Sequence, residues 1–242
     1  FTPSCVVTAL SMESNRALSF GIQKIDEAFP GFQKGDFAVL FRHPLCKTLS
    51  FLLSIRCQLP IKKGGLNSSV IYMDGGNTFD PYAVSTLAQE YDLEPKSALE
   101  KIFISRAFTA YQLTALVFEK LEAALKRHRS KLVIISDITG LFLDRDVPRI
   151  ESRDIFLKMT QYLLEVASRR RVVIVVSYFP RFHSSRCLFL ETVLFGKAST
   201  VIEIKEFKGV LKFVLENHPR LKPLTIDFPS DAVTMDRFME AY

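Results

Sequence analysis

Strand-like and helix-like segments alternate along most of this chain, and that alternation constrains its fold more than any other feature. Residues 37–41, 132–135 and 172–176 are entirely apolar, which is typical of strands that are buried on both faces. Such alternation predicts a largely parallel sheet covered by helices. We expect strands at residues 37–41, 69–73, 102–105, 132–135 and 172–176, and helices at residues 47–58, 81–91, 110–129 and 154–168.

The last third of the chain changes character. Residues 201–207 and 210–215 flank Lys208 and Gly209, and a short glycine-containing connection between strand-like segments indicates a hairpin. Antiparallel extensions of parallel sheets are common. We therefore expect a single domain, residues 1–242, with a leader at residues 1–17 and an antiparallel extension at residues 200–242.

Composition narrows the classes of protein to which the chain can belong. None of its apolar runs approaches the roughly 18 residues of a membrane helix, so we expect no membrane partner and a cytoplasmic location. Its four cysteines and four histidines lack metal-type spacing, so no metal site is expected. The formal net charge of +6 permits a polyanionic partner but does not demand one.

Six segments of the sequence stand in an order that is found in a known family. They are SFGIQKIDEAFPGFQKGD, the loop that ends in Lys47 and Thr48, VIYMDGGNTFDPY, ISRAFTAYQ, KLVIISDITGLF and VVIVVSYF. In these segments the chain resembles the ATPase core of the RecA superfamily, and most of all archaeal RadA and its paralogues, including KaiC-like proteins. The resemblance covers roughly residues 18–230. It implies a three-layer α/β fold of the RecA type, a P-loop NTPase fold with a mostly parallel twisted sheet and a C-terminal antiparallel hairpin.

The resemblance places a phosphate-binding loop at residues 41–48, FRHPLCKT. Such a loop follows G-x-x-x-x-G-K-[ST], in which glycines let backbone N–H groups converge on phosphate oxygens. Phe41 and Cys46 stand at the two glycine positions, and Pro44 has no N–H to donate. Lys47 and Thr48 remain as candidates for residual nucleotide binding. The alternative is a solvent-facing lysine and a threonine that caps a helix.

Three further positions depart from what the resemblance implies for ATP hydrolysis. Gly76 stands where the family has the glutamate that orients the attacking water. Ser136 stands where it has the Mg²⁺-associated aspartate, so Asp137 comes one residue late and faces away unless the strand end bulges. The next strand ends in Ser-Tyr-Phe at residues 177–179, without the amide pair of the family. We therefore expect no catalytic residue and no cofactor; Asp137 is a third residual nucleotide-binding candidate, and ATP with Mg²⁺ is expected only if the site is active.

In recombinases of this family, the segments after the fourth and fifth core strands face DNA. The first matching segment, residues 142–154, mixes acidic and basic residues almost evenly, which makes it a poor track for phosphates. The second, residues 180–197, combines basic with aromatic side chains: Arg181, Arg186, Lys197 and Phe182. That combination suits single-stranded DNA through phosphate contacts and base stacking. The alternative is that the apolar residues are core or subunit contacts and the arginines are solvated.

Two further basic runs stand at the ends of predicted helices: residues 127–131 end the helix at 110–129, and residues 169–171 follow the helix at 154–168. Cations at the C-terminus of a helix complement its dipole. We therefore interpret both runs as structural.

These features favour a RadA-like paralogue that has lost its ATPase activity and serves as an accessory or scaffold protein in archaeal-type DNA recombination or repair. Two alternatives stay open. One is a divergent DNA-dependent ATPase that uses Lys47, Thr48 and Asp137, and the other is a KaiC-like regulatory module that binds a protein or peptide at the vacated cleft. The expected partners are single-stranded DNA, a RadA-type recombinase or another protein or peptide, and further copies of the chain.

Overall fold

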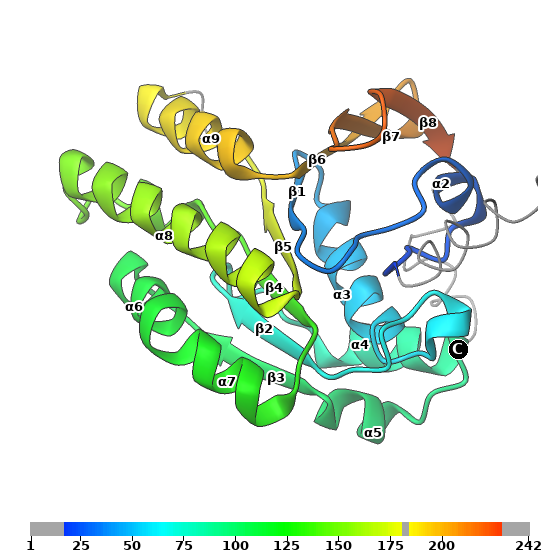
Figure 1. Cartoon of the computed structure of the whole chain (residues 1–242). Helices are drawn as coiled ribbons and strands as arrows, with labels where there is room; N and C mark the ends of the chain where they lie inside the picture. Colours follow the sequence, from blue (N-terminus) through cyan, green and yellow to red (C-terminus); the bar gives the residue numbers. More distant parts are fainter. Residues whose placement is uncertain (1–16, 181–183, 229–242) are drawn as a thin grey trace, which may run out of the picture.

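A computed structural model describes residues 17–180 and 184–228. Its centre is one sheet of eight strands in the order β3-β2-β4-β5-β1-β6-β7-β8 (Figure 1). The strands are β1 (Phe37–Phe41), β2 (Val70–Asp74), β3 (Ile102–Arg106), β4 (Leu132–Ser136), β5 (Val173–Tyr178), β6 (Thr200–Phe207), β7 (Val210–Asn217) and β8 (Leu224–Phe228). All pairs among β1 to β6 are parallel, whereas β7 pairs antiparallel with both β6 and β8. The predicted α/β fold with a C-terminal antiparallel hairpin is confirmed.

Helices cover both faces of this sheet and produce three layers (Figure 1). One face carries α2 (Gln23–Ala28), α3 (Leu45–Arg56), α4 (Pro81–Glu90) and α5 (Pro95–Glu100). The other carries α6 (Ala110–Ala115), the π-helical turn η2 (Leu116–Lys120), α7 (Leu121–His128), α8 (Arg149–Arg170) and α9 (Ser185–Lys197). Two short 3₁₀ turns, η1 (Ile61–Lys63) and η3 (Gly140–Leu143), lie in connections.

Successive residues of the central strands point into two different cores. In β1, Ala38 and Leu40 pack in the core beneath α3, whereas Phe37 and Val39 pack in the core beneath α8. Every residue of β1, β2, β4 and β5 is buried. A strand between two helical layers needs apolar side chains on both faces, which is why these strands are continuous apolar runs in the sequence.

Several elements differ from the sequence prediction. Helix α3 begins at Leu45, two residues early, and α8 begins at Arg149, five residues early, so it takes up the end of the predicted loop at residues 142–154. The predicted helix at residues 110–129 is interrupted by η2. Most of the predicted DNA-facing segment at residues 180–197 is helix α9, and strands 201–207 and 210–215 are followed by an unpredicted third strand, β8.

None of the described helices combines the length and the apolar character that crossing a membrane requires. Within residues 17–180 and 184–228, no three or more His, Cys, Asp or Glu side chains cluster as they would around a metal ion. Cys46, Cys57 and Cys187 are buried free thiols.

Candidate functional site

The carboxyl ends of the central parallel strands meet at one edge of the sheet, which is where α/β sheets usually bind ligands. A cavity of about 260 Å³ opens there, and we call it the strand-end cleft. Its lining includes His43 before α3, Lys47 of α3, Thr78 after β2, Ser136 and Asp137 at the end of β4, and Ser177 of β5. The predicted candidates Lys47 and Asp137 therefore line the same cavity. Thr48 is half-buried in α3 and is not among the lining residues.

The loop at residues 41–48 uses its backbone donors within the chain. Four N–H groups donate over 3.0–3.3 Å: Arg42 to the Tyr178 carbonyl, Leu45 to Nδ1 of His43, Cys46 to the His43 carbonyl and Lys47 to the Pro44 carbonyl. A phosphate-binding loop needs such donors to point at the ligand. Because α3 begins inside the loop, its first turn occupies the place of an open backbone cradle.

Phe41 and Cys46, which stand where a phosphate-binding loop has glycine, both have buried side chains. The ring of Phe41 stacks on Tyr178, with 5.6 Å between centroids, and contacts Phe195 at 4.8 Å. Burial, and then the nearby Glu191, raise the pKa of the Tyr178 phenol, so this wall of the cleft is neutral. Burial also raises the pKa of the Cys46 thiol to about 12. Both side chains therefore belong to the packing of the loop.

Ion pairs connect the loop at residues 41–48 to strand β6. Arg42 has a left-handed backbone, with φ 84°, and its Nε lies 2.5 Å from the carboxylate of Glu203, which is buried. Lys205 reaches the same carboxylate at 2.7 Å, and the His43 ring lies 3.9 Å from Glu206. Left-handed geometry costs a residue other than glycine about 1–2 kcal/mol, so the conformation of Arg42 depends on contacts such as these. Sequence reasoning missed Glu203, although one glutamate inside the apolar segment VIEI was a usable signal.

Asp74, at the end of β2, stabilises the turn that follows it. Its buried carboxylate accepts hydrogen bonds from Ser136 Oγ at 2.7 Å and from the N–H groups of Thr78 and Phe79, both at 3.0 Å. Arg106 Nε lies 3.8 Å away. Ser136 stands where the family has the Mg²⁺-associated aspartate, and its hydroxyl donates to Asp74.

Asp137 lies beside the position where a catalytic glutamate is expected but Gly76 is found. Its backbone is left-handed, with φ 49°, and this bend at the end of β4 brings it to the wall of the cleft. A Cβ added to Gly76 would lie 3.1 Å from the Asp137 Cβ. Alternation along a straight strand would have turned Asp137 away, and the positive φ supplies the bend that the sequence could not show.

The loop at residues 41–48, Asp74 and Asp137 all lie at the carboxyl ends of the parallel strands, beside the strand-end cleft. Comparison with known families matches residues 7–178 to the Rad51 family, and the match covers more than half of the chain. The chain belongs to the Rad51 family. It therefore has the RecA-type ATPase core that the sequence resemblance implied, and a recombinase-related function in general terms is supported. The matched residues include the loop at residues 41–48 and Asp137, whereas the antiparallel extension lies beyond them.

Two of the four predicted DNA-facing residues of this Rad51-family chain, Arg186 and Lys197, lie among the described residues. Arg181 and Phe182 lie outside the described residues. Arg186 and Lys197 lie about three turns, or roughly 16 Å, apart in α9. Arg186 Nη2 donates to the Val147 carbonyl at 3.0 Å, and burial lowers the pKa of its guanidinium. Lys197 is the last residue of α9, where a cation complements the helix dipole.

Proposed function

We propose that this Rad51-family chain is a RadA-like paralogue that does not hydrolyse ATP and acts as an accessory or scaffold protein in DNA recombination or repair. The observation that carries the proposal is the loop at residues 41–48, whose N–H groups donate within the chain. Rearranging four hydrogen bonds, each worth about 1 kcal/mol, costs roughly 4 kcal/mol that a preorganised glycine loop does not incur. That cost corresponds to a roughly thousandfold loss of affinity.

The residues near the cleft also support a loss of hydrolysis. Gly76 has no side chain with which to position water, and general-base assistance is typically worth about 10²–10⁴-fold. Ser136 is a neutral residue whose hydroxyl already donates to Asp74. Scaffolding therefore fits the chain better than turnover.

Calorimetric titration of the full chain with MgATP tests the proposal. We expect no saturable heat with MgATP or MgADP at millimolar nucleotide, and no ATP turnover above that of buffer, with or without DNA. The matched variant Lys47→Ala is expected to behave like the native protein. Saturable MgATP binding that Lys47→Ala abolishes would contradict the proposal.

One observation favours a second candidate, a divergent DNA-dependent ATPase. Lys47 and Asp137 line one cavity, and Asp137 lies beside Gly76. Lys47 and Thr48 would bind phosphate, and Asp137 would hold Mg²⁺ or orient water, which are the groups that phosphoryl transfer uses. This candidate requires turnover in the native protein that Asp137→Asn removes while ATP still binds.

A third candidate is a KaiC-like regulatory module that binds a protein or peptide in the strand-end cleft. It is supported by Phe179, which lines the cleft yet is 44% exposed. An aromatic side chain at the rim of a cavity is a typical anchor for a peptide. Loss of a captured peptide in Phe179→Ala, with unchanged stability, is the result that this candidate requires.

A further inference from the structure

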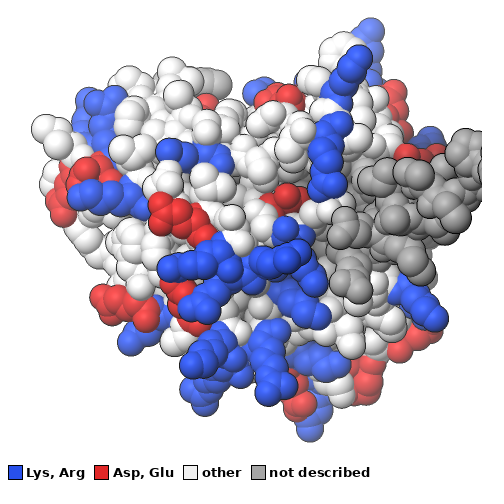
Figure 2. All heavy atoms as spheres, viewed as in Figure 1, with Lys and Arg blue, Asp and Glu red and all other residues white. Residues whose placement is uncertain are grey.

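A second hollow lies at the opposite, amino edge of the sheet, where segments that precede β1, β4 and β5 come together. It has a volume of about 550 Å³, and we call it the basic groove. Six of its lining residues are cationic: Lys34, Lys126, Arg129, Lys131, Arg170 and Arg171. Figure 2 shows lysine and arginine side chains gathered on this face, over the ends of α7 and α8.

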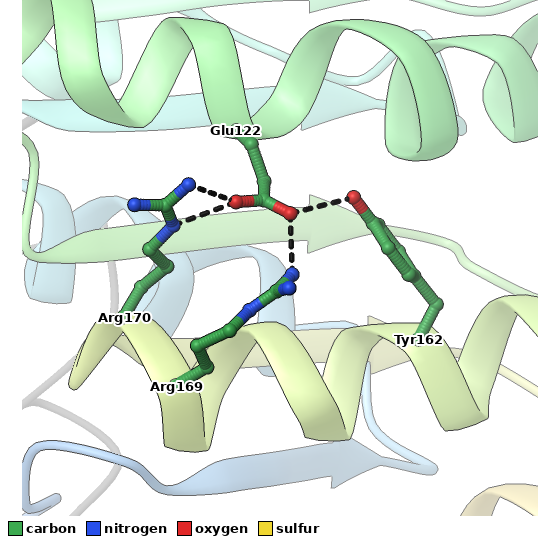
Figure 3. Close-up of polar contacts among 4 residues, drawn as sticks. All are labelled: Glu122, Tyr162, Arg169 and Arg170. Atoms are coloured by element: carbon green, nitrogen blue, oxygen red, sulfur yellow. Dashed lines mark hydrogen bonds and ion pairs between the residues drawn. The ribbon is translucent and has the colours of Figure 1, made fainter.

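The positive charge of the basic groove is only partly neutralised. Among the described residues, no carboxylate lines the groove, and Lys126, Arg129 and Arg171 form no ion pair. One carboxylate stands beside it: Glu122 of α7 pairs with Arg169 and Arg170 of α8 (Figure 3). One negative charge, from the first turn of α7, against two arginines leaves the end of α8 positive.

Two of the arginines occupy backbone positions that favour glycine. Arg129 and Arg171 follow α7 and α8 with φ 51° and 53°. Glycine is preferred in this left-handed position, where any other residue strains the backbone. A cation near the helix C-terminus interacts favourably with the dipole, but Lys126 and Arg169 already supply one to each helix. Helix stability alone therefore does not explain an arginine at both positions.

We propose that the basic groove binds the phosphate backbone of duplex DNA without sequence preference. A concave surface lined by cations attracts a polyanion, and guanidinium groups suit phosphate oxygens. No aromatic side chain of the described residues lines the groove, so it lacks the stacking platforms that single-strand binding uses. Its apolar lining residues, Leu125 and Val172, are buried, which leaves no apolar anchor for a membrane. The inference goes beyond the proposed function, because it holds whether or not the strand-end cleft binds ATP.

Fluorescence anisotropy of the full chain with a labelled duplex of about 30 base pairs, at about 50–200 mM salt, tests this inference. The groove variant combines Lys126→Ala, Arg129→Gly and Arg171→Gly. Because glycine suits both left-handed positions, the variant is expected to unfold at the native temperature or higher. Each lost phosphate contact lowers the slope of log K against log salt by about 0.9, so we expect a slope smaller by nearly 3 and at least about tenfold weaker binding.

A matched variant removes the same charge from exposed lysines outside the groove: Lys62→Ala, Lys63→Ala and Lys96→Ala. Its duplex affinity is expected to stay within about twofold of the native value, and two unrelated duplexes are expected to bind equally. The single variant Arg171→Gly, expected to lower the slope by about 0.9, keeps the test valid if the triple variant is unstable. Equal losses in both triple variants, or binding to anionic lipid vesicles but not to duplex, would overturn the inference. The inference would also be overturned if the native chain bound single-stranded DNA more tightly than duplex DNA and the groove variant kept that binding.

Discussion

At the scale of single residues, His43 shows how the loop at residues 41–48 is closed from inside. Its Nδ1 accepts the N–H of Leu45 at 3.2 Å, and its carbonyl accepts the N–H of Cys46 at 3.0 Å. The first N–H groups of a helix need partners from outside the helix, and in a nucleotide site a phosphate supplies them. Here one histidine supplies two acceptors, which removes the need for a bound anion at the start of α3.

A second histidine predicts how stability depends on pH. His218 Nδ1 accepts the N–H groups of Arg220 at 3.1 Å and Leu221 at 3.0 Å, and burial lowers the pKa of its ring. A protonated ring cannot accept these bonds, so the unfolded state takes up the proton more readily. The stabilisation is therefore complete above about pH 6.5, the value for the unfolded chain, and is lost as the pH falls toward the folded pKa.

Urea unfolding at about pH 7.5 and pH 5.5 checks this expectation. The native chain is expected to lose about 1 kcal/mol at the lower pH through these hydrogen bonds, in addition to changes from other groups. His218→Gln keeps an acceptor but does not titrate, so its loss on acidification is expected to be smaller by that amount. An identical loss in both proteins would show that His218 does not control it.

At the scale of elements, polar contacts join the first turn of α7 to the second half of α8. Glu122 accepts hydrogen bonds from Arg170 Nε at 2.6 Å and from Tyr162 Oη at 3.0 Å, and it also pairs with Arg169 (Figure 3). The Arg170 hydrogen bond is the main cause that holds the pKa of the Glu122 carboxyl below its usual value. This contact sets the spacing of two helices whose ends form one wall of the basic groove.

The substitution Glu122→Gln removes the negative charge of this contact but keeps a side chain of the same size. Exposed ion pairs are worth about 0–1 kcal/mol, so we expect unfolding free energy to fall by less than about 1 kcal/mol. Because one positive charge is no longer neutralised, duplex affinity is expected to rise roughly two- to fivefold at low salt. Anisotropy and urea unfolding measure the two effects. Weaker duplex binding would instead show that Glu122 holds the arginines in position.

The middles of these elements could be predicted from the sequence, but their ends could not. The apolar strands could be assigned to the centre of the sheet, because each needs two buried faces. Helix α8 begins at Arg149, inside the segment that the family resemblance assigned to a DNA-facing loop, and its first turn is held by Ser152, whose Oγ donates to the distant Phe142 carbonyl at 2.9 Å. The early start of α3 had a local signal, since Pro44 suits the first turn of a helix.

At the scale of the whole molecule, the sheet separates two hollows on opposite edges. The strand-end cleft collects residues that follow strands, and the basic groove collects residues that precede them. The sequence could place Lys47 near the first of these edges because its motif is local. It could not show that Lys34, Arg129 and Arg171 line one groove, because they are far apart in the chain and only the sheet order brings them together. The sequence left the direction of Asp137 open for a different reason, since its left-handed backbone leaves no pattern in the sequence.

Diffraction data from crystals grown with millimolar MgATP test most directly whether the loop at residues 41–48 is closed. We expect the N–H groups of Leu45, Cys46 and Lys47 to keep their bonds to His43 and Pro44, with no nucleotide density in the strand-end cleft. Phosphate density against those N–H groups, with Phe41 and Cys46 displaced from their present packing, would contradict that claim.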